Sequence, residues 1–323
     1  MSGSAGESRP KPVAQATPAD GQLFDEDFRR RLERLRLVVR RTTPGGLHGE
    51  HRARRRGRGV EFSDYRAYVP GDDMRDVDWL AYLRFDKLLL RLFDEEGDLP
   101  VYLLLDTSRS MATPDRSKLD QGKRLLAAIG CIALGQADRV TALAFAAGAR
   151  ESLETLRGAN QTHRLLRFLE GLDTASGSDL ALAVRGFFAR PRRPGLVVIA
   201  SDFLVEDGEP ARSAGLRRGG LPGALDLLAA LRHRVLALHL DQDLESLRPG
   251  SPRFEAVDAE SGERIRLHST AAAFREYHRQ AETYADAVRA ACRRHGFSYT
   301  RVSGQEPFDE VVLRLLRERG PLR

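Results

Sequence analysis

Cysteine and long apolar runs are scarce in this chain of 323 residues, and their scarcity excludes several classes of protein. The two cysteines, Cys131 and Cys292, lie in separate helical patterns, so the sequence predicts neither a disulfide framework nor a zinc site. The longest apolar stretch, Leu125 to Gly135, is much shorter than the roughly 18 residues of a membrane span. No charged start precedes an apolar signal core. We therefore expect a soluble, cytoplasmic protein without a membrane span.

Lysine is also scarce, since it occurs only at positions 11, 87, 118 and 123. The other basic residues are arginines spread over the whole length, so the formal net charge of +6 reflects composition and does not by itself predict a nucleic-acid surface. The exception is a local cluster from Arg52 to Arg58. It fits either a phosphate contact or a solvated loop bounded by glycines, and we favour the loop.

The N-terminal part of the chain divides by composition. Residues 1–23 have few large apolar side chains and are predicted to be a disordered leader. Residues 24–95 are predicted to form an accessory region, which opens with an amphipathic helix from Phe24 to Arg41. The pair Pro70-Gly71 fits the centre of a type II turn. We expect a small β unit around Trp79, docked on the main domain.

The accessory region is also rich in carboxylates, which leaves a catalytic acidic cluster as a second interpretation. We favour a structural role, because arginines nearby in the sequence can neutralise these groups. The acidic residues are Asp72, Asp73, Asp76 and Asp78, and the arginines are Arg66, Arg75 and Arg84.

An apolar run from Val101 to Leu105 ends abruptly in the polar sequence Asp106-Thr-Ser108-Arg-Ser110. Such a run is typical of a parallel strand that is buried on both faces. Helical spacing resumes at Lys118, so the polar turn joins a strand end to a helix start. Ligands bind in this kind of crevice in open α/β sheets, although a lone turn of this type can also serve only as a cap.

Residues 96–323 continue with strands that alternate with helices, which predicts an α/β fold with a doubly wound parallel sheet. One interruption, residues 253–268, alternates around a glycine and predicts a β-hairpin insertion. The expected strands are 139–147, 195–202, 234–240 and 297–302, and the expected helices are 161–172, 180–188, 225–231, 271–294 and 308–319.

Two further polar turns bear on the Asp106 turn. Ser176-Gly-Ser178-Asp179 precedes a helix, and Asp202 ends the strand that begins at Gly195. Parallel neighbouring strands deliver Asp106 and Asp202 to the same edge of a sheet. Carboxylate and hydroxyl oxygens from separate loops suit a hard cation such as Mg²⁺. The sequence therefore predicts a divalent-metal site at this edge.

A longer signature adds a family resemblance. Glu61-Phe and Arg66-x-Tyr-x-Pro-Gly-Asp-Asp-x-Arg75-x-x-Asp78-Trp79 resemble the signature of the domain of unknown function 58 family, over about Leu35 to the C-terminus. The carboxyl half of that family is similar to a von Willebrand factor A domain, a Rossmann-like fold. Many members begin with two membrane helices, so the resemblance implies that this chain is a soluble variant.

The resemblance implies a metal-ion-dependent adhesion site built from Asp-x-Ser-x-Ser, a threonine and an aspartate. Asp106, Ser108 and Ser110 match the first motif, and Asp202 matches the last residue. Ser178 stands in place of the usual threonine and keeps its hydroxyl. Phe203 replaces the glycine that often follows the last aspartate. Mg²⁺ or Mn²⁺ is the implied ion.

The implied function is a metal-dependent protein interaction in which a glutamate or aspartate of a partner binds the metal. The family also implies a role as adaptor or chaperone component beside a MoxR-type AAA+ ATPase. One alternative is a metal-dependent phosphatase or nuclease that uses Asp106, but a serine at position 108 stands where Asp-x-Asp phosphotransferases have a second aspartate. The other is nucleic-acid binding through Arg52 to Arg58, which we consider unlikely. We expect a protein that is not an enzyme.

Overall fold

The computed structural model describes residues 23–42, 56–57, 61–69, 74, 77–94, 98–112, 116–204, 220–241, 253–257, 264–268 and 271–317. The predicted leader, apart from Leu23, and the arginine cluster, apart from Arg56 and Gly57, lie outside these residues. The same holds for the predicted turn at Pro70-Gly71 and for the carboxylates of the acidic cluster other than Asp78.

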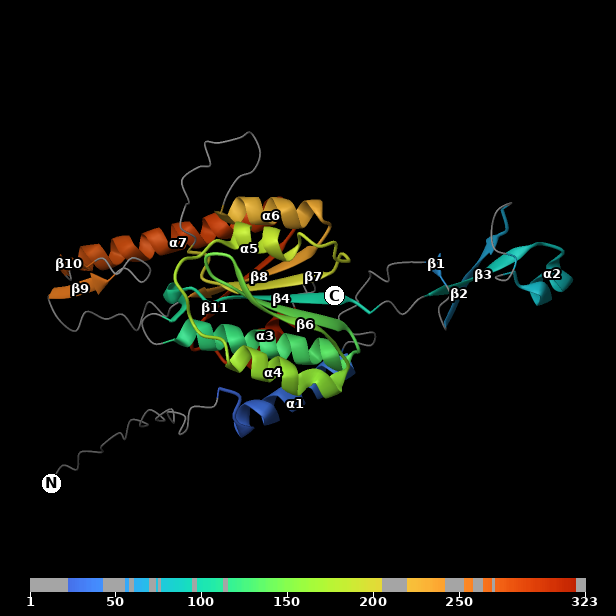
Figure 1. Ribbon diagram of the computed structural model, residues 1–323, viewed down its shortest axis with the longest axis horizontal. Coiled ribbons are helices and arrows are strands. Elements are labelled where there is room, and N and C mark those ends of the chain that lie inside the picture. Colours follow the sequence, from blue (N-terminus) through green and yellow to red (C-terminus); the bar gives the residue numbers. More distant parts are fainter. Residues whose placement is uncertain are drawn as a thin grey trace, which may run out of the picture.

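A six-stranded sheet forms the centre of the molecule, with the strand order β11-β8-β7-β4-β5-β6 (Figure 1). Five neighbouring strands are parallel, which confirms the predicted α/β class, but β6 pairs antiparallel with β5 and corrects the expectation of an all-parallel sheet. The strands are β4 (Pro100–Asp106), β5 (Arg139–Phe145), β6 (Ala149–Arg157), β7 (Leu196–Ser201), β8 (Arg234–Asp241) and β11 (Ser298–Ser303).

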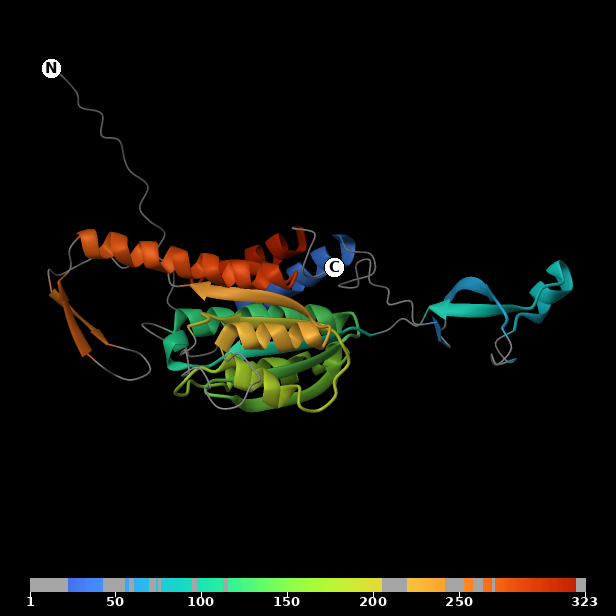
Figure 2. The ribbon, with the colours of Figure 1, turned by 90° about the horizontal axis from the view of Figure 1, so that it is seen from above.

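Helices cover both faces of this sheet. One face carries α1, α3, α4 and α8, and the other carries α5, α6 and α7 (Figures 1 and 2). The helices are α1 (Glu26–Thr42), α3 (Ser117–Gly135), α4 (Thr162–Glu170), α5 (Leu180–Phe187), α6 (Gly220–Ala230), α7 (Ala271–Arg294) and α8 (Phe308–Arg317). Short 3₁₀ turns lie at η3 (Arg109–Ala112) and η4 (Ala159–Gln161). We call the six strands and the helices other than α1 the main domain.

Strand β4 is apolar without interruption because both faces of the sheet are covered at this strand. Leu103 and Leu105 face the core on one side of the sheet, while Tyr102 and Leu104 face the core on the other. Because successive side chains of a strand point to opposite faces, a strand covered on both sides needs apolar residues at every position.

The two cysteines are small core residues on opposite faces of the sheet. Cys131 lies in α3 and Cys292 in α7, and both are fully buried and free. Burial raises the pKa of the Cys131 thiol to about 12 and that of Cys292 to about 11. Neither thiol is therefore ionised at neutral pH, and both are unreactive.

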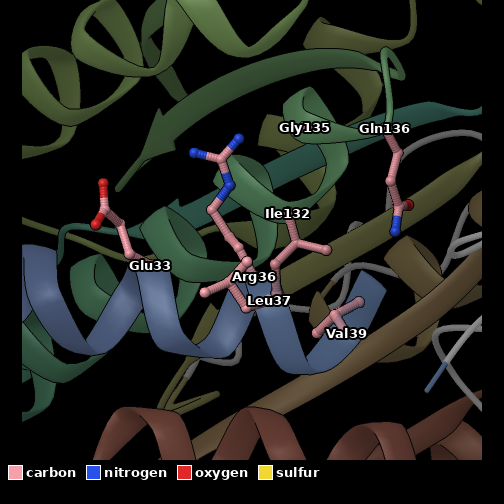
Figure 3. A pocket seen from close by; sticks show the side chains of 7 residues that line it. All are labelled: Glu33, Arg36, Leu37, Val39, Ile132, Gly135 and Gln136. Carbon is pink, nitrogen blue, oxygen red and sulfur yellow. The ribbon is translucent and has the colours of Figure 1, made fainter. Parts of the chain in front are cut away.

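Helix α1 packs on the main domain, against α3 and α8. Its buried side chains Phe28 and Leu32, together with Phe24 just before the helix, join the same apolar core as α3. A cavity of about 230 Å³ lies between α1 and the end of α3. Figure 3 shows Arg36 of α1 reaching toward Gly135 there. The division of the chain into regions 24–95 and 96–323 stays a prediction.

The remaining accessory elements stand apart from the main domain in Figures 1 and 2, which corrects the expectation of a docked unit. They are a sheet of order β1-β3-β2 and one helix: β1 (Arg56–Gly57), β2 (Glu61–Ala67), β3 (Leu89–Asp94) and α2 (Trp79–Phe85). Asp78 caps α2 by accepting the Leu80 and Ala81 N–H groups, and it also accepts the Tyr65 hydroxyl. Trp79 is 52% exposed, so it is not the centre of a core.

The predicted hairpin is confirmed as an antiparallel pair, β9 (Arg253–Val257) and β10 (Arg264–His268). It lies near the start of α7, beyond the main sheet (Figure 2). Within the part of the chain that the structure describes, no helix is long and apolar enough to cross a membrane.

We predict that Gly195→Ala destabilises the main domain by about 1–3 kcal/mol, the usual cost of overpacking. Gly195 precedes β7 and approaches β4 so closely that an added Cβ would lie inside van der Waals contact of the Pro100 carbonyl oxygen. Urea unfolding measures the change. Gly186→Ala in α5 is the control, because its Cβ would meet Ala149 at an ordinary 3.8 Å. Equal stability of the two variants would contradict the prediction.

Candidate functional site

The candidate site lies where the two central strands end. Asp106 is the last residue of β4, and Asp202 directly follows β7. The two strands are parallel neighbours, with Leu105 opposite Ala200. The chain runs from β4 to one side of the sheet through β5 and β6 and then crosses back to β7. Such a switch point leaves a crevice at the carboxyl ends of the strands, where α/β proteins bind ligands.

The turn after β4 holds its polar groups inward. Asp106 and Ser108 are fully buried, and Ser110 is almost so. Asp106 Oδ1 accepts the N–H of Ser108 at 2.9 Å, which folds the turn back on its own aspartate. The hydroxyl oxygens of Ser108 and Ser110 lie 3.0 Å apart. These contacts bring all three predicted ligands of the first motif together.

Ser178 reaches the site because its loop is tied to the same turn. Thr107 accepts the Ala175 N–H at 2.8 Å, and Ser108 forms an isolated parallel bridge with Ala175. Gly177 has φ +77°, a conformation that suits glycine, and the loop then enters α5. The Ser178 hydroxyl donates to Asp106 Oδ2 at 3.4 Å. The structure thus places Ser178 beside Asp106.

Asp202 is also buried, but its partner was not predicted. Lys118, in the first turn of α3, donates its ammonium to Asp202 Oδ2 at 2.8 Å. The side chains are 8% and 4% exposed, so this is a buried ion pair. Asp202 Oδ1 accepts the N–H of Leu204 at 3.1 Å. Both carboxylate oxygens of Asp202 are therefore engaged within the protein.

Two further residues around Asp106 were missed in the sequence. Ser201 donates its hydroxyl to Asp106 Oδ2 at 2.6 Å, and Thr107 donates its hydroxyl to the Phe145 carbonyl at 2.8 Å. Ser201 was visible as the residue before Asp202, at the end of a buried strand. Lys118 was visible as one of only four lysines in the sequence.

Phe203, the residue after Asp202, adopts a backbone conformation that usually favours glycine. Its φ is +56°, in the left-handed region that bulky residues rarely adopt. The Phe203 N–H donates to Ser201 Oγ at 2.8 Å, and the Tyr284 hydroxyl donates to its carbonyl. The ring is fully buried and meets His239 edge-on at 5.6 Å. Packing and these bonds hold a conformation that costs on the order of 1–3 kcal/mol elsewhere.

Burial governs the electrostatics of the site. Burial and the nearby charge of Asp202 raise the pKa of Asp106 to about 6, against the opposing hydrogen bonds from Ser201 and Ser108. Burial also lowers the pKa of His239 to about 4, and its Nδ1 lies 2.7 Å from the Tyr299 hydroxyl. His239 is therefore neutral at pH 7, while the ionised form of Asp106 lacks a full counter-charge.

The chemistry of the donors fits a hard cation in part. Asp106, Ser108, Ser110 and Ser178 offer carboxylate and hydroxyl oxygens, which Mg²⁺ prefers. Among the described residues, no group of three or more His, Cys, Asp or Glu side chains could hold a metal, so an ion here would depend on the hydroxyls. Asp202 fits less well, because Lys118 already neutralises it.

We predict that Asp106→Asn stabilises the metal-free protein at pH 8. Folding raises the pKa of Asp106 from 3.8 to about 6, so the stability of the fold falls as pH rises between these two values, and the full destabilisation is present above pH 6. At about 1.4 kcal/mol per pKa unit, removing the charge contributes roughly 1–3 kcal/mol. Thermal unfolding in EDTA measures the gain, which becomes smaller at pH 5.

Asp179→Asn is the control for this variant. Asp179 caps α5 by accepting the Leu182 N–H at 2.8 Å, and asparagine caps helices equally well. We expect little change there. A lower melting temperature of Asp106→Asn at pH 8 would contradict the prediction.

Comparison with known proteins gives relatives without an assigned role. Uncharacterised proteins of Mycobacterium tuberculosis and Mycobacterium bovis are 30% identical over 249 residues, which cover 75% of this chain and 74% of each relative. The solved structure of the conserved hypothetical protein BatB from Bacteroides thetaiotaomicron is similar with a TM-score of 0.42 and 17% identity, over 68% of this chain and 98% of that one. The pilus adhesin SpaC from Lactobacillus rhamnosus GG has a TM-score of 0.42 and 11% identity, over 69% of this chain and 30% of that one.

The family comparison covers most of the main domain and part of the accessory region. The model of the proteins of unknown function DUF58 matches residues 64–287, which include all five predicted metal ligands. On this match, and on the mycobacterial relatives, the chain belongs to the DUF58 family.

Proposed function

We propose that the main domain is a von Willebrand factor A-like module that binds a divalent cation, Mg²⁺ or Mn²⁺, and through it a carboxylate of another protein. The proposed metal ligands are Asp106, Ser108, Ser110, Ser178 and Asp202. No enzymatic step is part of this proposal, and a cytoplasmic location stays a prediction.

One observation carries the proposal: oxygen atoms from separate loops meet at the switch point of the sheet. The Ser178 hydroxyl lies 3.4 Å from Asp106 Oδ2, although the two residues are 72 positions apart in the chain. Ser108 and Ser110 bring their hydroxyls to the same turn, 3.0 Å from each other. Ser178 thus adds a third hydroxyl, from a distant loop, to the two hydroxyls of the turn after β4.

The donor set also suggests how a partner would be held. Hydroxyl ligands are neutral, so they leave much of the metal's charge available for a further oxygen ligand. Mg²⁺ keeps several of its waters in protein sites, and an incoming glutamate or aspartate can replace one of them. A metal-bridged complex of this kind is reversible and depends on the metal.

The proposed partner is a MoxR-type AAA+ ATPase, or a client protein that exposes an acidic residue. This part of the proposal depends on the family resemblance, which implies a role in assembling or maturing other proteins. The site contributes the requirement that the partner present a carboxylate.

We predict that Mg²⁺ raises the melting temperature of the wild-type protein and that EDTA reverses this effect. Asp106→Ala removes the central carboxylate and should abolish both the Mg²⁺ shift and the Mg²⁺-dependent capture of a MoxR-type ATPase. Differential scanning fluorimetry measures the shift, and affinity capture with purified ATPase measures binding.

Asp286→Ala serves as the matched control, because Asp286 lies exposed on α7, paired with Arg289 at 2.7 Å. It should behave as the wild type in both assays. If Asp106→Ala kept the Mg²⁺ shift and the capture, the proposed site would be wrong. If capture persisted in EDTA but fell steeply with salt, charge contacts would carry the binding instead.

A second prediction concerns the residue that departs from the family pattern. Ser178→Ala removes one neutral oxygen ligand and should weaken Mg²⁺ binding on the order of tenfold, the loss expected for one hydrogen-bond-sized contribution of about 1.4 kcal/mol. Ser178→Thr keeps the hydroxyl and should stay near the wild-type affinity. Isothermal titration calorimetry compares the three proteins, and an unchanged affinity of Ser178→Ala would remove Ser178 from the ligand set.

A further inference from the structure

Lys118 forms a buried ion pair with Asp202 and is not itself among the proposed metal ligands. Two of the chain's four lysines, Lys118 and Lys123, are buried in α3. Lys123 donates to the backbone carbonyls of Glu170 and Leu172, at 3.2 and 2.6 Å. Lys118 instead reaches a carboxylate of the candidate site, at 2.8 Å. Its ammonium therefore lies where a cation bound to Asp202 would also lie.

Charge counting shows what this ammonium changes. Asp106 and Asp202 carry two negative charges when ionised, and Lys118 reduces the sum to one. A divalent cation would then bring the site to one positive charge, whereas without Lys118 the site would be neutral. In a buried setting a charge of the same sign weakens the binding of a cation.

We propose that Lys118 is an internal counter-ion that occupies Asp202 in the metal-free protein and lowers the affinity of the site for divalent cations. This inference rests on the proposed metal site. Lys118 also leaves the metal-loaded site with the one positive charge that a partner's carboxylate neutralises. Metal and acidic partner then strengthen each other's binding, because each removes a charge that is unfavourable for the other.

Lys118 could instead position Asp202 as a metal ligand, and this role would change metal affinity in the opposite direction. If Lys118 only held Asp202 in place as a ligand, its loss would weaken metal binding. If it competes with the metal, its loss strengthens binding. The sign of the change in metal affinity therefore separates the two roles.

The experiment compares the full-length wild type with Lys118→Met, Lys118→Gln and Lys118→Arg. Mn²⁺ alone is the probe, because the electron paramagnetic resonance signal of the free ion measures binding directly. We expect the two neutral variants to bind Mn²⁺ on the order of tenfold more tightly than the wild type, and the arginine variant to bind much as the wild type does. Glutamine can still donate to Asp202, so it serves if the methionine variant does not fold.

Lys123→Met is the matched control, since it removes a buried lysine from the same helix without touching Asp202. It should leave Mn²⁺ affinity at the wild-type level. In EDTA, Lys118→Met should melt below the wild type, because Asp202 loses its buried partner, and Mn²⁺ should raise its melting temperature by more than it raises that of the wild type.

The outcomes separate this inference from the proposed function. Tighter Mn²⁺ binding by the neutral variants supports Lys118 as the counter-ion, even if the wild type binds too weakly to measure. Equal or weaker binding by these variants, beside clear binding by the wild type, overturns the inference and leaves the metal site standing. An absence of Mn²⁺ binding in every protein overturns both.

Discussion

Two carboxylates buried next to each other at one sheet edge are the constraint on which the rest of this structure depends. A buried charge is unfavourable unless it is paired or hydrogen-bonded, and the protein meets this need with different partners for the two carboxylates. Asp106 receives hydrogen bonds from Ser108, Ser178 and Ser201 but keeps a raised pKa. Asp202 receives the ammonium of Lys118. These hydrogen-bond and ion-pair partners are positioned by the pairing of β4 with β7, by the start of α3 and by the loop before α5.

The sequence allowed the centre of this arrangement to be predicted. The apolar run that ends at Asp106 marks a strand covered on both faces, and Asp202 ends a second such strand, so their meeting at one edge follows from parallel pairing. Strand β6 was missed because seven of its nine residues are exposed, so it lacks an apolar pattern. It is an edge strand, held mainly by its ladder with β5, and such strands need little burial. Trp79 led to a wrong prediction for the opposite reason. Its large apolar side chain suggested a core position, but it is 52% exposed.

The rest of the site depends on contacts that cannot be predicted from local sequence patterns. Lys118 begins an ordinary helix, and only the three-dimensional fold shows that its side chain crosses to Asp202, 84 positions away. From the sequence, Phe203 suggested a site rim shaped differently from one with glycine at this position. Its backbone nevertheless adopts the left-handed conformation that favours glycine. The ring is anchored by His239 and the carbonyl by Tyr284, so residues from β8 and α7 maintain the shape of a loop after β7.

Two features of the site lower the stability of the fold. A buried carboxylate with a raised pKa and a phenylalanine in left-handed backbone are each unfavourable for folding, and the two apolar cores supply the stability that offsets them. In the proposed function, a cation at the switch point would relieve the charge on Asp106, whereas Lys118 pairs with Asp202 in the metal-free protein. Because each carboxylate has a separate partner in the metal-free state, the protein can stay folded with the site empty. A site that is stable when empty and stabilised further when filled is the arrangement that reversible, metal-dependent recognition requires.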